Sequence, residues 1–124
     1  MKIDRLLVSI VDDDESVRES LPDLVQQLGF AAAAFSSAGA FLASGALPET
    51  RSLILDVAMP DMSGPELLEE LRHRRLDIPV IFITARGDES VRRELLARGA
   101  VACLFKPFSE RALREALDAA LGTR

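Results

Sequence analysis

Short, nearly continuous hydrophobic runs alternate along the chain with longer amphipathic segments. Four such runs occupy residues 6–11, 53–55, 80–83 and 101–105. Runs of this length are typical of parallel strands that helices cover on both faces. Residues 31–35 form a weaker, alanine-rich segment, which we predict to be an edge strand because it is too short to stand as a helix. The pattern therefore predicts five strands.

Helical periodicity fills the gaps between these strands. The first helix is predicted to begin at Asp14 or Glu15, where acidic side chains match the positive end of the helix dipole. Pro22 predicts either a kink or a helix shorter than 15–28, because an interior proline costs about 3 kcal/mol. The alternation predicts five βα units in one domain, residues 1–124. Further helices are predicted at 38–43, from Ser63, from Asp88 to before Gly99, and from Ser109.

Composition and charge limit the function classes. The formal net charge of -5 argues against a nucleic-acid-binding surface, which needs clustered Lys and Arg. No hydrophobic stretch approaches the roughly 20 residues that span a bilayer, so we expect no membrane association and a cytoplasmic location. Cys103 is the only cysteine and lies inside a hydrophobic run, which predicts a packing role for its side chain.

Four of the hydrophobic runs end on residues that chemistry can use. Asp12 and Asp13 follow the first run, Asp56 the second, Thr84 the third and Lys106 the fourth. Because the carboxyl ends of parallel strands line one crevice, we expect these side chains to lie close together. Each alone has an ordinary explanation, such as a solvated helix start or a surface lysine. Their joint appearance at four strand ends favours a functional site.

The residue types at these positions suit a metal ion and a phosphoryl group. Two carboxylates about 4 Å apart repel by roughly 4 kcal/mol at an effective dielectric near 20, so a cluster needs a cation or a shifted protonation. Few oxygen ligands, with room for water and phosphate, suit Mg²⁺ better than a fully caged Ca²⁺. Asp56 could then act as a nucleophile, while Lys106 and the Thr84 hydroxyl bind phosphoryl oxygens.

The motifs around these residues resemble the receiver domain of two-component response regulators, over essentially the whole chain. The resemblance implies an α/β fold, flavodoxin-like or CheY-like, with a doubly wound five-stranded parallel sheet in the order 2-1-3-4-5. It looks closest to receivers that precede helix-turn-helix output domains of the nitrogen-fixation (FixJ) type. The motifs are Val11-Asp12-Asp13, Asp56-Val57-Ala58-Met59-Pro60 with Ser63-Gly64, Thr84-Ala85 and Phe105-Lys106-Pro107-Phe108.

The resemblance also implies roles for individual residues at the metal site. A histidine kinase would transfer its phosphoryl group to Asp56 in a Mg²⁺-dependent reaction. Asp13 and Asp56 would bind Mg²⁺ directly, with the backbone carbonyl of Ala58 as a third ligand. Asp12 would act largely through water.

The remaining implied roles concern the phosphoryl group and the output. Lys106 would pair with the phosphoryl group, and its bond to Pro107 is expected to be cis. Thr84 would move toward the phosphate and reshape the face of the fourth helix, fifth strand and fifth helix. The domain would catalyse only its own phosphorylation and dephosphorylation. A homodimer on activation and a C-terminal DNA-binding output domain outside this chain are further implied partners, while the domain itself would bind neither nucleic acid nor membrane.

One position departs from the family pattern. Three residues before Lys106, where many receivers have Tyr or Phe, this chain has Cys103. A thiol sweeps little volume, so movement of Thr84 cannot be coupled to a swinging aromatic ring at that position. We expect coupling through the loop at residues 85–89 instead, with Gly87 as a flexible point.

Other function classes fit the sequence less well. A haloacid-dehalogenase-type phosphatase also uses an aspartyl nucleophile, but it needs a second Asp at the position of Ala58. A nucleotide- or flavin-binding domain needs a first loop rich in glycine or hydroxyl groups, whereas residues 12–15 are all acidic. The main alternative is a phosphorylation-independent interaction module with a receiver fold, which Cys103 alone favours.

Overall fold

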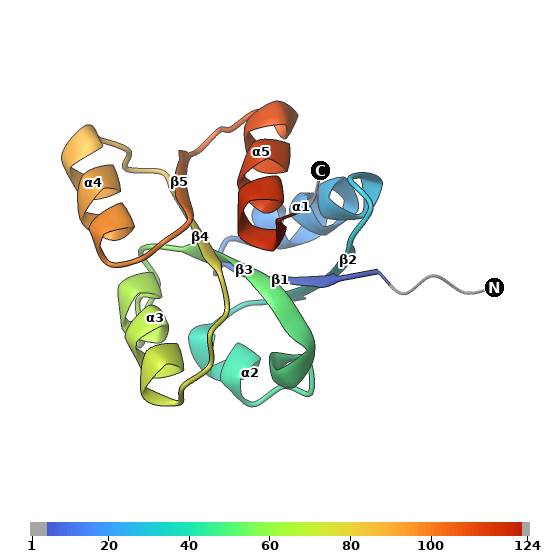
Figure 1. The fold of residues 1–124 in the computed structure, drawn as a ribbon, viewed down its shortest axis with the longest axis horizontal. Helices are drawn as coiled ribbons and strands as arrows, with labels where there is room; N and C mark the ends of the chain where they lie inside the picture. Colours follow the sequence, from blue (N-terminus) through green and yellow to red (C-terminus); the bar gives the residue numbers. More distant parts are fainter. Residues whose placement is uncertain (1–4, 123–124) are drawn as a thin grey trace.

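The chain forms a five-stranded parallel sheet with helices on both faces (Figure 1). The computed structural model describes residues 5–122, so the predicted domain of residues 1–124 extends beyond the described part at both ends. The strands lie in the order β2-β1-β3-β4-β5, and each neighbouring pair is parallel. This is the predicted fold, with the alanine-rich strand at an edge. The strands are β1 (Leu7–Val11), β2 (Ala31–Phe35), β3 (Thr50–Asp56), β4 (Val80–Thr84) and β5 (Ala102–Phe105).

The helices begin where capping residues occur in the sequence. Asp14, Ser63, Asp88 and Ser109 each accept a hydrogen bond from a backbone N–H in the first turn of the helix that follows. These N-caps satisfy donors that have no partner inside the helix. The helix starts predicted from the sequence are therefore confirmed. The helices are α1 (Glu15–Gln27), α2 (Ala38–Leu42), α3 (Gly64–His73), α4 (Glu89–Ala97) and α5 (Glu110–Leu121), with a short 3-10 helix at Leu47–Glu49.

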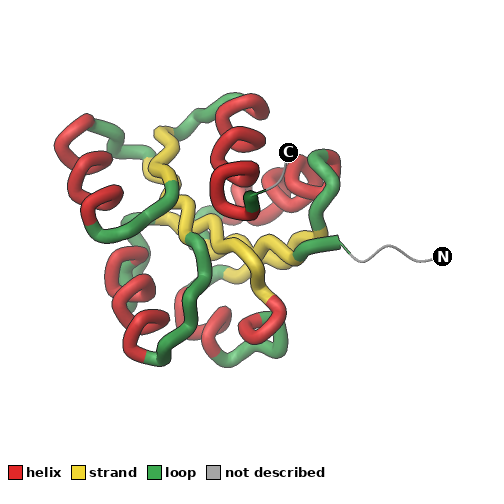
Figure 2. The backbone as a smooth tube through the Cα atoms, in the orientation of Figure 1, coloured by secondary structure: helices red, strands yellow, loops and turns green. Residues whose placement is uncertain are grey.

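Two hydrophobic cores lie on opposite faces of the sheet. Helices α1 and α5 cover one face and α2, α3 and α4 cover the other, as the strand and helix colours of Figure 2 show. On β3, Leu53 and Leu55 pack toward α2, α3 and α4, whereas Ile54 packs toward α1 and α5. Because both faces are buried, the inner strands read as continuous hydrophobic runs.

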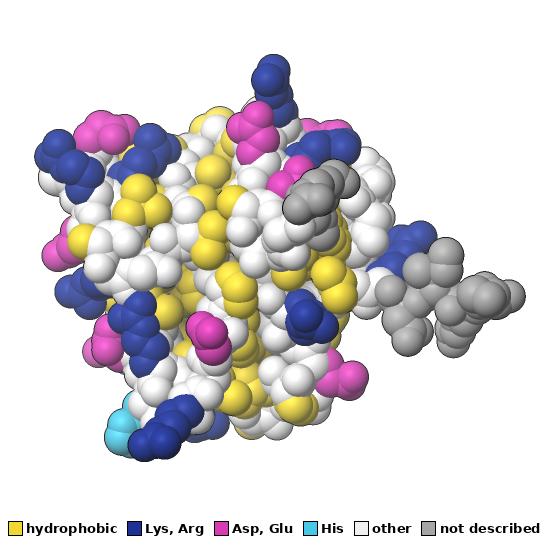
Figure 3. Space-filling model, viewed as in Figure 1, with side chains coloured by type: hydrophobic (Ala, Val, Ile, Leu, Met, Phe, Trp, Pro, Cys, Tyr) yellow, Lys and Arg dark blue, Asp and Glu magenta, His cyan; other side chains and the backbone are white. Residues whose placement is uncertain are grey.

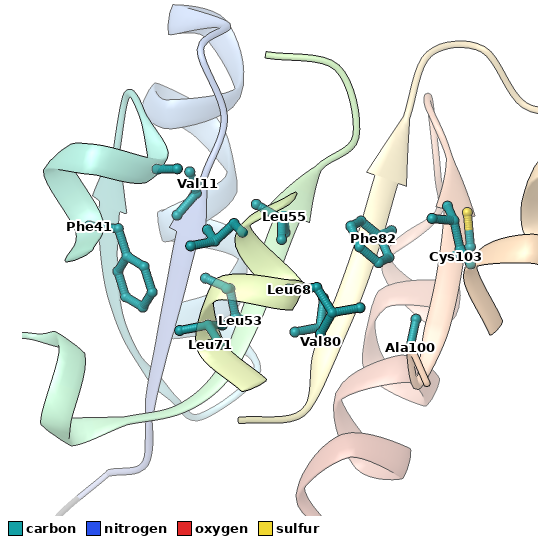
Figure 4. Close-up of a cluster of buried hydrophobic side chains, with 13 residues drawn as sticks. Val11, Phe41, Leu53, Leu55, Leu68, Leu71, Val80, Phe82, Ala100 and Cys103 are labelled. Atoms are coloured by element: carbon teal, nitrogen blue, oxygen red, sulfur yellow. The ribbon is translucent and has the colours of Figure 1, made fainter. Parts of the chain in front are cut away.

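Cys103 belongs to the core under α2, α3 and α4. Figure 4 shows it on β5 beside Phe82, its partner in the β4–β5 register. The residue is 3% exposed, and burial raises the pKa of its thiol. A buried, protonated thiol is a weak nucleophile. The predicted packing role of Cys103 is confirmed.

Strand β3 begins three residues earlier than the sequence pattern predicts. Thr50 and Ser52 are buried in it despite their hydroxyl groups. The Thr50 Oγ1 atom lies 2.7 Å from Ser9 Oγ on β1, and the Ser52 hydroxyl donates to the carbonyl of Pro79 at 3.2 Å. The prediction of 53–55 was too short because these partners are distant in sequence and satisfy the buried hydroxyls.

Helix α1 continues through Pro22 and ends at Gln27. The proline therefore does not end the helix, which is one residue shorter than 15–28. Leu21 and Val25, on either side of the proline, are both buried against the sheet. We attribute the continuity of the helix to this packing, which offsets the cost of an interior proline.

Acidic and basic side chains are interspersed on the face of the molecule drawn in Figure 3. His73, at the end of α3, is exposed. Between residues 5 and 122, none of the helices combines the length and the hydrophobicity that crossing a membrane requires.

Candidate functional site

The predicted site residues meet in one cavity at the carboxyl end of the sheet. Asp12 and Asp13 follow β1, Asp56 ends β3, Thr84 ends β4 and Lys106 follows β5. All five line a cavity of about 410 Å³. Topology explains the convergence, because the strands are parallel and end at the same edge. The rest of the lining comes from Asp14, Val57, Ala58, Ala85, Arg86 and Val91.

Three carboxylates form the acidic part of the cavity. One oxygen from each of Asp12, Asp13 and Asp56 lies within 4.8 Å of the others. Asp12 is fully buried, Asp56 is 7% exposed and Asp13 lies open to solvent. Carboxylate oxygens grouped in this way fit a hard divalent cation, with Asp13 on the side where water can complete the coordination.

Lys106 partly neutralises this cluster. Its Nζ atom donates to Asp12 Oδ2 at 2.8 Å and lies 3.6 Å from Asp56 Oδ1. Burial lowers the pKa of the ammonium, but the hydrogen bond to Asp12 and the charge of Asp56 outweigh it and raise the pKa of Lys106. The lysine is therefore a cation at neutral pH, set against three carboxylates.

The remaining electrostatic repulsion among the carboxylates acts mainly on Asp56. Burial and the negative charge of Asp12 raise the pKa of Asp56 from 3.8 to about 6, Lys106 opposes this shift and Asp13 adds to it. A carboxyl group in these surroundings prefers to hold a proton or to lie beside a cation. A divalent ion among the three carboxylates would relieve the repulsion, so the donor set fits a metal ion in both chemistry and charge.

Asp12 is fixed by hydrogen bonds on three sides. The backbone N–H of Asp14 donates to its Oδ1 atom at 2.9 Å, and Lys106 occupies Oδ2. Arg18, one turn into α1, donates to the Asp12 carbonyl at 3.0 Å. The sequence reasoning missed Arg18, since the only signal is its position four residues after the N-cap Asp14. Each carboxylate oxygen of Asp12 therefore accepts a hydrogen bond.

The loop after β3 is held against the cavity by Gly64. The Gly64 N–H donates to the Val57 carbonyl at 2.9 Å. A Cβ atom at Gly64 would collide with the Asp56 carbonyl and would lie 2.9 Å from a ring carbon of Phe82. Only glycine fits this close approach, which holds the segment carrying Ala58 beside Asp56.

Thr84 and Lys106 complete the cavity wall. The Thr84 hydroxyl accepts a hydrogen bond from the Arg86 N–H at 3.1 Å, so its own O–H stays available as a donor. Thr84 is 5% exposed. The Lys106–Pro107 peptide bond is cis, as predicted.

Comparisons with known proteins agree with this geometry. Residues 8–118 match the model of the response regulator receiver domain. The chain is 41% identical to the transcriptional regulatory protein FixJ of Azorhizobium caulinodans over 117 residues, which are 94% of this chain and 56% of that protein. It is 44% identical to the FixJ protein of Rhizobium meliloti over 115 residues, 91% of this chain and 55% of that protein.

A solved structure supports the same relationship. The crystal structure of FixJ-N superposes with a TM-score of 0.83 at 40% sequence identity and covers 100% of this chain and 98% of that one. The chain thus spans about half the length of the two FixJ proteins and nearly all of FixJ-N. The chain belongs to the response regulator receiver domain family, and its acidic pocket of Asp12, Asp13 and Asp56 is typical of phosphoacceptor receivers.

Proposed function

We propose that Asp56 accepts a phosphoryl group from a sensor histidine kinase in a Mg²⁺-dependent reaction. The observation that carries this proposal is the convergence of the Asp12, Asp13 and Asp56 carboxylates and Lys106 in a single cavity. A buried carboxylate next to a cation site and an ammonium is positioned to attack an electrophilic phosphorus atom. The family membership of the chain supports the same reaction.

In the proposed reaction an Asp56 carboxylate oxygen forms a bond to phosphorus. The bond between phosphorus and the imidazole nitrogen of the donor breaks, and that nitrogen takes up a proton. Bound Mg²⁺ supplies charge neutralisation for the carboxylates and the transferring group. The residues proposed to hold the ion are Asp13, Asp56 and the carbonyl of Ala58 directly, with Asp12 acting through water.

Lys106 and Thr84 are proposed to stabilise the transferring group. The Lys106 ammonium already lies 3.6 Å from Asp56, so a small movement from Asp12 would bring it to a phosphoryl oxygen on Asp56. The Thr84 hydroxyl, which also lines the cavity, has a proton to donate to a second oxygen. Donors placed this close to the reacting group stabilise the developing charge with only a small rearrangement.

The proposal extends to partners and to the wider protein. The chemistry on Asp56 would be limited to the domain's own phosphorylation and dephosphorylation. The FixJ proteins are transcriptional regulatory proteins of about twice the matched length. We therefore propose that residues 1–124 form one receiver domain that works in the cytoplasm with a C-terminal DNA-binding output domain. Its α4, β5 and α5 face would carry the signal and a homodimer on activation.

The proposal is tested by intact mass spectrometry after incubation with Mg²⁺ and acetyl phosphate or phosphoramidate. We expect one added phosphoryl group on the native protein and none on an Asp56→Asn variant. Replacing Mg²⁺ with excess chelator from the start should also prevent the addition. A folded native protein that binds Mg²⁺ and gains no mass would contradict the proposal and favour a phosphorylation-independent interaction module.

A further inference from the structure

The loop between β4 and α4, residues 85–88, joins the candidate site to the start of α4. At one end of the loop the Arg86 N–H donates to the Thr84 hydroxyl inside the cavity. At the other end Asp88 caps α4 by accepting from the Val91 N–H. A change at Thr84 therefore reaches the first turn of α4 through four loop residues.

The middle of this loop rests on an aromatic ring. The three atoms nearest to a Cβ built at Gly87 all belong to the ring of Phe105, and each would collide with it. Phe105 is half-buried, and it is the partner of Thr84 in the β4–β5 register. The loop can lie over the ring in this position only because residue 87 has no side chain.

Arg92 of α4 also contacts the Phe105 ring. The Arg92 guanidinium carbon lies 4.2 Å from the centroid of the Phe105 ring, a distance typical of a cation–π contact. Its Nε atom donates to the Cys103 carbonyl at 3.2 Å, and its Nη1 atom donates to Glu89 at 3.0 Å. The ring thus contacts both the loop and the first turn of α4.

Phe105 differs from Cys103 in its contacts, because only the Phe105 side chain contacts both the loop and α4. Both side chains lie on the same face of β5, two residues apart, in the core under α2, α3 and α4. Cys103 is 3% exposed and lies beside Phe82. Arg92 donates to its backbone carbonyl and, within residues 5–122, not to its thiol. Phe105 touches both the loop and α4.

We propose that Phe105, which contacts both Gly87 and Arg92, transmits the state of Asp56 to α4. This inference rests on the proposed phosphorylation of Asp56. A phosphoryl oxygen draws the Thr84 hydroxyl away from the Arg86 N–H, and the loop 85–88 shifts. Gly87 then no longer covers Phe105, the ring moves, and the contact with Arg92 that orders the first turn of α4 is lost. The Cys103 thiol plays no part in this movement.

Hydrogen exchange measured by mass spectrometry tests this coupling. Peptides covering residues 85–98 are compared with and without Mg²⁺ and acetyl phosphate, and the intact mass of each sample reports its phosphorylation. We expect phosphorylation of the native protein to increase exchange in these peptides. Phe105→Leu keeps a hydrophobic side chain, and Arg92→Met keeps the length of the side chain while it loses the charge. Both variants should still gain the phosphoryl group, but their exchange difference should fall to less than half of the native value.

Cys103→Ala is the matched control, because it removes only the thiol from the same face of the same strand and keeps the backbone carbonyl that accepts from Arg92. It should phosphorylate and show the full native exchange difference. Native-size differences in both Phe105→Leu and Arg92→Met would overturn the inference, as would a Cys103→Ala variant that loses its response. If the native protein is phosphorylated but the hydrogen exchange of residues 85–98 does not change, the role of Phe105 is wrong and the proposed function still holds. If the native protein is not phosphorylated, both the proposed function and the role of Phe105 are wrong.

Discussion

Asp56 shows how a buried carboxylate in an acidic cluster lowers the stability of the domain that carries it. Its pKa is raised from 3.8 to about 6, chiefly by burial and by the charge of Asp12. Between these two pH values the native state holds the proton while the unfolded state has lost it. The contribution of this residue to stability is therefore present at low pH, falls as the pH rises through about 6, and is absent above it.

An Asp56→Asn substitution should therefore stabilise the metal-free protein at neutral pH. A shift of about two pKa units, which already includes the attraction to Lys106, corresponds to about 3 kcal/mol. Solvent screening at the partly open cavity reduces the gain, so we expect an increase of about 1–2 kcal/mol in the free energy of unfolding at pH 7.5. Urea denaturation in the presence of chelator measures it. The gain should shrink as the pH falls from 6 toward 4.

Asp23→Asn is the matched control for the change in net charge, because Asp23 is an exposed carboxylate on α1. It should change the free energy of unfolding by less than about 0.5 kcal/mol. An Asp56→Asn variant no more stable than the control at pH 7.5 would show that the electrostatic cost at Asp56 is small. A gain independent of pH would show that its cause is not the ionised carboxylate.

At the scale of elements, the start of β3 depends on a buried hydroxyl pair. Thr50 donates to the Ala46 carbonyl at 2.8 Å, so the 2.7 Å contact between Ser9 and Thr50 requires Ser9 as the donor. Ser9 is fully buried. Removing the Thr50 hydroxyl would leave the Ser9 donor and the Ala46 carbonyl without this partner, whereas removing the Ser9 hydroxyl leaves the bond from Thr50 to Ala46 intact.

A double-mutant cycle measures this pair. We expect Thr50→Val to lower the free energy of unfolding by about 2–3 kcal/mol and Ser9→Ala by about 1 kcal/mol. The double variant should lower the free energy of unfolding by less than the sum of the two single variants. When residue 9 is alanine, Thr50→Val no longer leaves a buried hydroxyl donor without an acceptor. Strictly additive urea-denaturation energies would show that the two hydroxyls act independently.

Helix starts and strand ends could be predicted from the sequence, but the start of β3 could not. The N-caps Asp14 and Ser63 act on residues two or three positions away, so the local sequence contains the whole interaction. The hydroxyl of Thr50 is paired with a residue 41 positions away on β1. A polar residue whose partner is distant looks like a loop residue in the local pattern, and the predicted strand therefore began too late.

The same distinction applies to the candidate site. The convergence of Asp12, Asp56 and Lys106 follows from their positions at the ends of parallel strands, so it could be predicted once the sheet was recognised. The hydrogen bond from Arg18 to the Asp12 carbonyl and the packing of Phe105 under Gly87 depend on how helices and loops settle against the sheet. No spacing rule in the sequence indicates either contact.

At the scale of the whole molecule, negative charge is both spread over the surface and concentrated in one cavity. The chain carries a formal net charge of -5, and the cavity sets three carboxylates against one lysine. Any added salt screens the surface repulsion, but only a cation held among the three carboxylates removes the local repulsion. The two effects can be separated, because ionic strength can be matched while the identity of the cation changes.

Magnesium should therefore raise the thermal unfolding midpoint beyond the effect of sodium at equal ionic strength. A ligand that binds only the native state at ten times its dissociation constant stabilises it by about 1.4 kcal/mol, which for a domain of this size corresponds to roughly 4–8 °C. An Asp13→Asn variant should lose most of the magnesium-specific part, because Asp13 is the exposed member of the three carboxylates. It should keep the sodium response, which depends on the whole surface. Equal shifts with the two salts in the native protein, measured by differential scanning calorimetry, would show that the carboxylates do not act together as a divalent-cation site.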